Sequence, residues 1–388
     1  MTVRLFQESD RTAWDEYVNS HPRATLYHLS AWRSVIAKTY GHQSYYLMAF
    51  RDSVGSVQSN ALPESGSVVE KPQYQAVSEK PDSRPVGILP LVHLKHFLFG
   101  NNLVSIPFFD LGGILADNQE IERALLSEAM RIGRELGVGQ LELRHLEPLS
   151  CLDGGGGASL AYEGKWAAQT LSHKVRMILE LPDSPEALMN SFKAKLRSQI
   201  RKPIKEGLTA KIGGTELLDE FYGVFCTNMR DLGSPVHSKR LIENVLGEFP
   251  DHAKIVVVYK DAQPLACSLV VAFRDILENP WASALREYSA LSPNMLLYWT
   301  MLEYACTQGF KYFDFGRSTP DEGTYKFKQQ WGAKPTPLHW QYMSLNGRPA
   351  AGDNMDKSRF EKAIQYWQKL PVPVTKILGP MIRKHISL

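Results

Sequence analysis

Apolar residues recur at helical spacing along the first half of the chain. They lie three and four positions apart, as in helices packed on a core, over the segments 8–20, 29–41 and 118–138. Ser30 is placed to cap the second of these helices, and Gly41 to end it. Runs typical of strands occupy 43–52, 86–96 and 139–146. The first two strand segments are predicted to pair as a hairpin.

The second half repeats this order. A strand is predicted over 173–181, followed by helices over 184–208, 214–233 and 238–249. The segment 253–275 is predicted to be a hairpin that turns at Asp261-Ala262-Gln263. A helix, a glycine and a strand follow over 294–317, in the same order as the helix and strand of 118–146. A repeat of about 170 residues indicates duplicated domains rather than a solenoid.

These patterns predict an α/β fold of two domains, each with a mixed sheet flanked by helices. We expect the first domain over 1–170, the second over 171–345, and a C-terminal helix with a basic tail over 354–388. The segment of about 52–85 is rich in Ser, Pro, Glu and Val, and it is predicted to be a mobile insertion in the first domain.

The composition of the chain indicates a globular protein of a reducing compartment. The 388 residues are 44% hydrophobic and 22% charged, as in soluble globular proteins, and a net charge of +3 gives no overall indication of a nucleic-acid partner. The four cysteines form no CxxC pair, which predicts a reducing compartment and no structural zinc. Without a signal-peptide pattern, or an apolar run near the roughly 20 residues of a membrane span, we expect a cytoplasmic location.

A basic helix is predicted over 184–208. Lys193, Arg197 and Arg201 recur at fourfold spacing on one face, while the opposite face is expected to enter a core through Phe192, Leu196, Ile200 and Ile204. The basic face is either a solvated surface or a contact for a phosphate or polyanion.

The second candidate feature is a predicted helix start at Ser292-Pro293, with serine as the N-cap and proline in the first turn. Open N–H groups at such a start can bind an anionic group. Aromatic and polar residues suited to a polar, extended ligand surround it: Trp281, Arg286, Tyr288, Asn294 and Tyr298. The alternative interpretation is packing between the domains.

The third candidate feature is the segment 311–333. Asp314 and Arg317 lie among aromatic residues, and Lys326 and Lys328 flank Phe327. Asp314 is a candidate general base, or it orients Arg317 or a lysine, or it forms a strand-end salt bridge with Arg317. The two lysines are candidates for holding a phosphate or carboxylate.

This segment also carries a family likeness. Its motif Phe313-Asp314-Phe315-Gly316-Arg317-Ser318, continued by Gly323, Phe327, Lys328, Trp331 and Gly332, resembles the FemAB-like proteins. The chain is most similar to the branch that accompanies exosortase and exopolysaccharide systems. The resemblance implies two tandem GNAT-like (acyl-CoA N-acyltransferase-like) domains, each with a mainly antiparallel mixed sheet, and a cleft between them. Asp314 and Arg317 would be catalytic, and Ser318, Arg201 and the residues around Ser292 would bind substrate.

The resemblance further implies transfer of an acyl or aminoacyl group to an amine of a peptidoglycan or exopolysaccharide precursor. The donor would be acyl-CoA or aminoacyl-tRNA, with no tightly bound cofactor. The chain departs from the usual acyl-CoA pattern, because Arg286-Glu-Tyr-Ser-Ala-Leu-Ser-Pro contains no glycine to bring backbone N–H groups to a pyrophosphate. This departure favours another donor, such as a charged tRNA as partner, or a changed mode of CoA binding. It also keeps open a non-catalytic protein that binds glycan precursors or scaffolds envelope assembly.

The C-terminal region has two interpretations. Its helix and basic, apolar tail either pack on the second domain or contact the inner membrane peripherally. The residues that would make the membrane contact are Trp367, Lys376, Ile377, Leu378, Ile382, Arg383 and Lys384.

Overall fold

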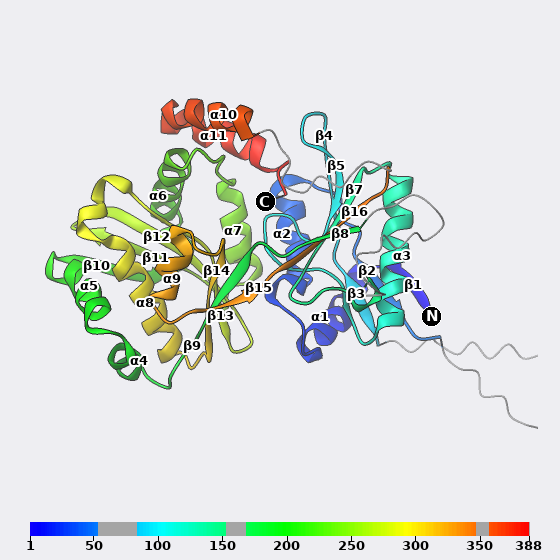
Figure 1. Ribbon diagram of the computed structural model, residues 1–388, viewed down its shortest axis with the longest axis horizontal. Helices are drawn as coiled ribbons and strands as arrows, with labels where there is room; N and C mark the ends of the chain where they lie inside the picture. The colour runs from blue at the N-terminus through cyan, green and yellow to red at the C-terminus, as the bar shows by residue number, and fades with distance from the viewer. Residues whose placement is uncertain (53–83, 153–167, 347–356, 388) are drawn as a thin grey trace, which may run out of the picture.

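The computed structural model describes residues 1–52, 84–152, 168–346 and 357–387. The chain forms two α/β halves side by side, with the last two helices across the top of the molecule (Figure 1). The predicted fold class is confirmed in both halves, since mixed, mainly antiparallel sheets are flanked by helices. The predicted mobile insertion lies outside the described residues.

The second half is built on a seven-stranded sheet. Its order is β10 (Leu208–Gly213), β11 (Ala253–Lys260), β12 (Gln263–Phe273), β13 (Ile276–Ala284), β14 (Tyr312–Ser318), β9 (Val175–Glu180) and β15 (Lys334–Pro337). Only the β13–β14 pair of this sheet is parallel. Helices α5 (Ala194–Lys205) and α8 (Pro293–Thr307) share one core with the sheet, and α6 (Leu218–Asp231) and α7 (Lys239–Glu248) share the core on its other side.

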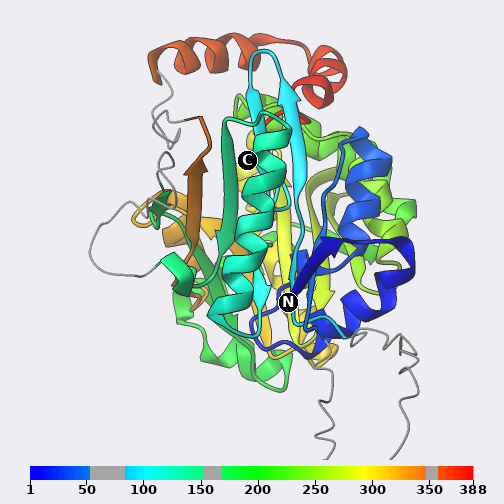
Figure 2. The ribbon, with the colours of Figure 1, turned by 90° about the vertical axis from the view of Figure 1, so that its right-hand side faces the viewer.

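The first half divides its strands between two sheets. One contains β1 (Thr2–Leu5), β2 (Leu47–Phe50), β3 (Gly87–Leu89) and β6 (Leu115–Ala116); the other contains β4 (Val92–His96), β5 (Gly100–Val104), β7 (Gln140–His145), β16 (His339–Ser344) and β8 (Ala168–Leu171). Helix α3 (Gln119–Glu135) covers the outer face of these strands (Figure 2). The predicted strand 86–96 is thus divided at Pro90, which cannot donate a ladder hydrogen bond.

Two crossings of the chain tie the halves together. Strand β8 leads into β9 in one direction, and β15 leads into β16 in the other, with Leu338 N–H donating to Lys174 O at 3.0 Å between them. Strand β16 belongs by sequence to the range 171–345 predicted for the second domain, yet it pairs with β7 and β8 of the first half. The first half therefore completes its sheet with chain from beyond the predicted boundary.

A continuous apolar core joins the halves. Helices α1 (Arg11–Ser20) and α2 (Ala31–Tyr40) of the first half share it with α6 and α7 of the second. Trp32 is fully buried there, with its ring 4.4 Å from Phe109 and 4.9 Å from Phe249. Burial of aromatic rings from both halves fixes their relative position.

Local signals placed several elements correctly. Helix α2 begins after Ser30 and ends at Gly41, whose φ of +70° is the left-handed conformation that glycine adopts easily. The hairpin of β11 and β12 turns where it was predicted. The predicted basic helix 184–208 is instead two helices, α4 (Pro185–Ser191) and α5, because the chain is extended at Phe192. Ile204 was wrongly assigned to the core: it is 51% exposed, and Pro203 is buried in its place.

The C-terminal region is helical throughout most of its length. Helices α10 (Lys357–Lys369) and α11 (Val372–Arg383) are separated at Pro371, so the predicted tail is a second helix. Among the described residues, no helix has the length and hydropathy needed to cross a membrane.

Trp32→Ala tests the shared core. We expect a loss of about 3–5 kcal/mol in the free energy of unfolding, because the substitution leaves a cavity between the two halves. Urea titrations followed by circular dichroism would measure it. Tyr366→Ala is the control: its side chain is 72% exposed, and it should change stability by less than about 0.5 kcal/mol. Equal stability of the wild type and Trp32→Ala would contradict a core that holds the halves together.

Candidate active site

The hydrogen-bonded ladder between β13 and β14 stops halfway along both strands. Its last registered pair is Glu278–Asp314. Beyond this pair, β13 carries a bulge at Asn279 and Pro280, and β14 has an irregularity in which Gly316 takes a φ of +74°. Proline offers no N–H, and a left-handed residue turns its strand, so the two strands part at this point.

A cavity of about 700 Å³ opens where the strands part. Its walls come from β13, β14 and β9, from the loop 108–111 of the first half, from the loop 232–237, and from α9 (Gly323–Gln329) and the C-terminal helices. A space of this size between two domains suits a polar ligand larger than a single amino acid.

A buried group of three charges lies at the floor of the cavity. Arg176 of β9 donates from Nε to Asp314 Oδ2 at 2.8 Å, and its Nη2 lies 3.7 Å from Glu278 Oε1. The other oxygen of Asp314 accepts the Gly316 N–H at 2.8 Å. All three charged side chains are less than a tenth exposed. One cation therefore faces two carboxylates in a place that water barely reaches.

Burial raises the pKa of Glu278. Arg176 lowers the pKa, the neighbouring Asp314 raises it, and the Tyr27 hydroxyl lowers it, with a result of about 7. A carboxyl with a pKa near neutrality suits the role of a general base. The oxygens of Asp314 are already bonded, which suits a positioning residue better than the catalytic base predicted from sequence.

Lys328 reaches the same cavity from α9. Its Nζ donates to Gly316 O at 3.1 Å and to Arg317 O at 2.7 Å, and its side chain is almost fully buried. Burial lowers the pKa of this ammonium to about 8, although Asp314 and Asp110 partly oppose the shift. The position therefore presents a positive charge close to the parted strands.

Arg317 pairs across the domain boundary. Its Nη1 lies 2.9 Å from Asp110 Oδ1, and its guanidinium stacks 5.3 Å from the Trp340 ring centroid. The strand-end salt bridge between Asp314 and Arg317 that the sequence suggested is wrong, because Asp314 pairs with Arg176 instead. The two residues are three apart, and the bulge in β14 directs Arg317 toward the first half.

The far wall of the cavity contains a cation that pairs with no carboxylate within the described ranges. Arg383 of α11 donates from Nε to His237 Nε2 at 3.0 Å, and His237 Nδ1 lies 3.0 Å from the Tyr40 hydroxyl. Burial lowers the pKa of Arg383 to about 10 and also holds the pKa of His237 well below its usual value. A neutral imidazole thus orients a charged guanidinium that faces the cavity.

The structure brings together some of the residues predicted from sequence. Those that line the cavity are Trp281, Tyr298, Asp314, Arg317 and Lys328. Those that are not part of its lining are Arg201, Arg286, Tyr288, Asn294, Ser318 and Lys326. Arg201 is exposed on α5, and Ser318 is buried in β14. The substrate-binding roles expected of this second set stay predictions.

The helix predicted to start at Ser292 is present, but the segment before it is not an open loop. Residues Arg286–Leu291 form a 3-10 helix, and Ser292 has a φ of +56°. The N–H groups of Tyr288, Ser292 and Met295 donate within the segment, to Leu285 O, Ser289 O and Ser292 O. Fewer backbone donors are thereby left for a pyrophosphate than in a glycine-rich loop.

Several site residues escaped the sequence analysis, namely Tyr27, Asp110, Arg176 and Glu278. A charged residue inside an apolar strand was the available signal, since Arg176 stands in VRMILE and Glu278 in ILENPW. Among the described residues, no group of three or more His, Cys, Asp or Glu side chains is arranged to hold a metal ion.

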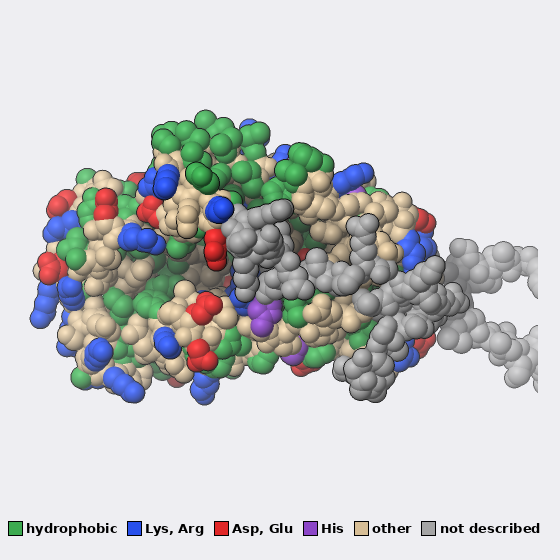
Figure 3. All heavy atoms as spheres, turned by 45° about the horizontal axis from the view of Figure 1, so that its top comes forward, with side chains coloured by type: hydrophobic (Ala, Val, Ile, Leu, Met, Phe, Trp, Pro, Cys, Tyr) green, Lys and Arg blue, Asp and Glu red, His purple; other side chains and the backbone are tan. Residues whose placement is uncertain are grey.

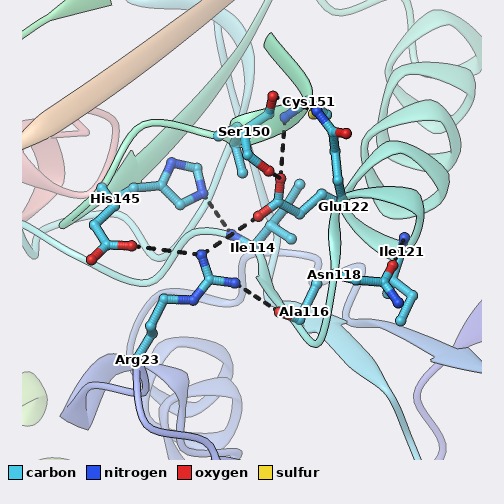
Figure 4. A network of polar contacts seen from close by, with 12 residues as sticks. Arg23, Ile114, Ala116, Asn118, Ile121, Glu122, His145, Ser150 and Cys151 are labelled. Atoms are coloured by element: carbon cyan, nitrogen blue, oxygen red, sulfur yellow. Dashed lines mark hydrogen bonds and ion pairs between the residues drawn. The ribbon is translucent and has the colours of Figure 1, made fainter. Parts of the chain in front are cut away.

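The corresponding strand of the first half carries a charge pair of its own, beside a smaller cavity of about 210 Å³. On β7, Arg144 donates from Nε to Glu142 Oε1 at 2.9 Å and is fully buried. Close by, a second polar network braces the end of the sheet (Figure 4): Arg23 donates to Ala116 O at 2.7 Å and lies 3.5 Å from Glu122, and the Ile114 N–H donates to His145 at 2.8 Å. These contacts support the first half rather than a second reaction site.

Glu278→Gln tests the buried charge group. A raised folded-state pKa means that stability is lost as pH rises from the unfolded value of 4.5 through about 7. The amide carries no charge, so the variant should gain up to about 3 kcal/mol over the wild type between pH 5 and pH 8. Urea unfolding at both pH values would measure the gain. A difference that does not depend on pH would show that Glu278 is ionised normally.

Comparison with known proteins agrees with this architecture. Residues 190–329 match the family model described as an acetyltransferase (GNAT) domain. A search of curated protein sequences found no match.

Solved structures share the fold over nearly the whole chain. The FemX crystal structure has a TM-score of 0.59 at 16% identity, covering 88% of this chain and 97% of FemX. A tandem GNAT protein from the clavulanic acid biosynthesis pathway has a TM-score of 0.52 at 12% identity, covering 91% and 100%. A conserved protein of unknown function from Bacteroides thetaiotaomicron has a TM-score of 0.51 at 8% identity, covering 89% and 99%. Residues 190–329 thus match a GNAT domain, and the chain as a whole shares the two-domain fold of FemX and of the tandem GNAT protein.

Proposed function

We propose that the protein is an acyl- or aminoacyltransferase that acts on an amine of a peptidoglycan or exopolysaccharide precursor. The observation that carries the proposal is the parting of β13 and β14 above a titratable carboxylate. Parted strands offer main-chain groups to an extended donor, much as a sheet edge accepts an added strand. The GNAT match of residues 190–329 supports the same class of reaction.

The residues at the cavity floor suit amine acylation. Glu278 accepts a proton from the acceptor ammonium, and the neutral amine attacks the acyl carbon of the donor. The new carbon–nitrogen bond leaves negative charge on the acyl oxygen, which the ammonium of Lys328 stabilises. Collapse of this intermediate breaks the bond between the acyl carbon and the sulfur or ribose oxygen of the donor. That atom leaves with the proton that the new amide nitrogen gives up, and Glu278 releases its own proton to water. Asp314 and Arg176 hold the geometry.

The donor proposed here is an aminoacyl-tRNA, with acyl-CoA as the alternative. The 3-10 segment before α8 uses its own N–H groups, which disfavours a standard pyrophosphate contact. The face of α5 with Lys193, Arg201 and Lys205 is exposed and can neutralise phosphates of a nucleic acid. Both facts favour the larger donor.

The acceptor is proposed to be anionic. Arg383 faces the cavity without a carboxylate partner in the part of the chain that the structure describes, and Arg317 and Lys328 line the same space. A phosphate or carboxylate of an envelope precursor would pair with Arg383. The acceptor amine would then be held near Glu278 on the opposite side.

A transfer assay tests the proposed function. Purified protein is mixed with charged tRNA or acyl-CoA and with nucleotide-linked or lipid-linked sugar-peptide precursors, and mass spectrometry follows the acceptor. We expect one donor to add its acyl mass to the acceptor, and Glu278→Gln to slow transfer by about a hundredfold. Precursor binding without any mass gain would support the non-catalytic alternative instead.

The pH profile of kcat/KM offers a second test. Activity should rise as Glu278 loses its proton near pH 7 and fall as Lys328 loses its proton near pH 8. Lys328→Arg keeps the positive charge, so its falling limb should move to higher pH while the rising limb stays. A profile of Lys328→Arg that matches the wild type would remove Lys328 from the reaction.

A further inference from the structure

Helix α11 packs on the protein through its small residues and exposes its large apolar ones. Val374, Ile377, Leu378 and Met381 recur at helical spacing and point outward, with Ile377 68% and Met381 60% exposed. The buried positions of the helix are Thr375 and Gly379. An apolar stripe at i, i+3, i+4 and i+7 normally faces the core. Here the stripe lies on the outside.

This orientation is fixed by specific contacts on the inner side of α11. Gly379 lies so close to Val236 that a Cβ would come within 2.9 Å of its backbone nitrogen. Beyond the helix, Ser387 O accepts the Phe108 N–H at 2.6 Å, and before it Leu370 O accepts from Arg230 at 3.1 Å. The helix cannot roll its stripe inward without losing these contacts.

A second apolar element lies beside the end of α11. The turn between β4 and β5 exposes Phe97 at 87% and Leu98 at 71%. The ring of the adjacent His96 is 4.2 Å from that of His385, which places the turn next to the C-terminal end of the helix. Figure 3 shows hydrophobic side chains gathered over the C-terminal helices at the top of the molecule, with a second group beside them.

The chain segment that forms most of this surface is basic. Between 361 and 387, Glu361 is the one acidic residue, whereas the lysines there are Lys362, Lys369, Lys376 and Lys384. Lys95 is exposed on β4 next to the turn. Exposed apolar side chains on helices that also carry lysines match a bilayer with anionic headgroups, into which the apolar groups insert while the lysines stay at the phosphates.

The surface also borders the cavity. Ile364 of α10, Arg383 of α11 and Ile386 just beyond it line the cavity wall, while their neighbours Tyr366 and Met381 are exposed outside. A molecule anchored in the bilayer therefore meets the cavity at its edge.

We propose that α10, α11 and the β4–β5 turn form a docking surface for an anionic membrane. The surface is a property of the fold and does not depend on the reaction. The further step, that the acceptor is a lipid-linked precursor presented at the bilayer surface, rests on the proposed function.

Vesicle sedimentation of the full chain tests the docking surface. The probes are vesicles of phosphatidylcholine alone and vesicles containing roughly a third phosphatidylglycerol. We expect saturable binding to the anionic vesicles that weakens as salt is raised, and little binding to the neutral ones. Ile377→Glu with Met381→Glu should weaken binding about tenfold or more, and Phe97→Ser should weaken it as well.

The matched control is Ile204→Glu with Ile212→Glu, because it places the same charges at two exposed isoleucines of the second half. This control should bind vesicles like the wild type. Absence of wild-type binding, or equal loss in the control, would overturn the proposal. Light scattering completes the test: a dimer that Ile377→Glu with Met381→Glu abolishes, without vesicle binding by the wild type, would assign the surface to a second copy of the chain. No donor or acceptor is needed, so failure of the transfer assay leaves this result independent.

Discussion

The candidate site depends on the buried guanidinium of Arg176 between two carboxylates. The three side chains come from β9, β13 and β14, and they meet at the last registered pair of the β13–β14 ladder. Burial is the largest cause of the raised pKa of Glu278, about 7; Arg176 opposes it and the neighbouring Asp314 adds to it. The burial of this carboxyl beside a second one is what suits the strand ends to moving a proton.

In the two halves, the number of residues between an acid and an arginine on one strand decides whether the two side chains pair with each other. Glu142 and Arg144 are two apart on β7, so they share a face of the strand and close on each other. Asp314 and Arg317 are three apart and would lie on opposite faces of a regular strand. The bulge at Gly316 directs Arg317 to Asp110, and Asp314 is left for Arg176. The same charge pattern therefore braces one half and opens a site in the other.

The sequence could predict what local interactions decide. The stop at Gly41 and the turn at Asp261 follow from the conformations of a few neighbouring residues. The cap predicted at Ser30 is not made, because the Ser30 hydroxyl donates to Asp15 instead. The exchange of β16 into the first sheet does not, because its partners lie about 170 and 200 residues away in the chain. The site also depends on contacts between distant parts of the chain, because the cavity residues come from both halves and both ends of the chain. Asp314, Arg317 and Lys328 could be found because one short motif contains them, whereas Arg176, Glu278 and Arg383 needed the tertiary structure.

Helix α11 shows what the spacing of apolar residues cannot predict. The tail predicted here is instead a helix in which Ile377, Leu378 and Met381 form one apolar face. The spacing of apolar residues shows which of them share one face of the helix. It does not show whether that face packs on the protein core or meets a bilayer. The close approach at Gly379 decides the question for the protein side, because only a small residue fits against Val236. The large apolar residues are then turned away from the core, toward a partner that supplies its own apolar volume. A bilayer fits this surface because the nearby lysines pair with anionic lipid headgroups. The apolar core of a protein–protein interface is depleted in such charges.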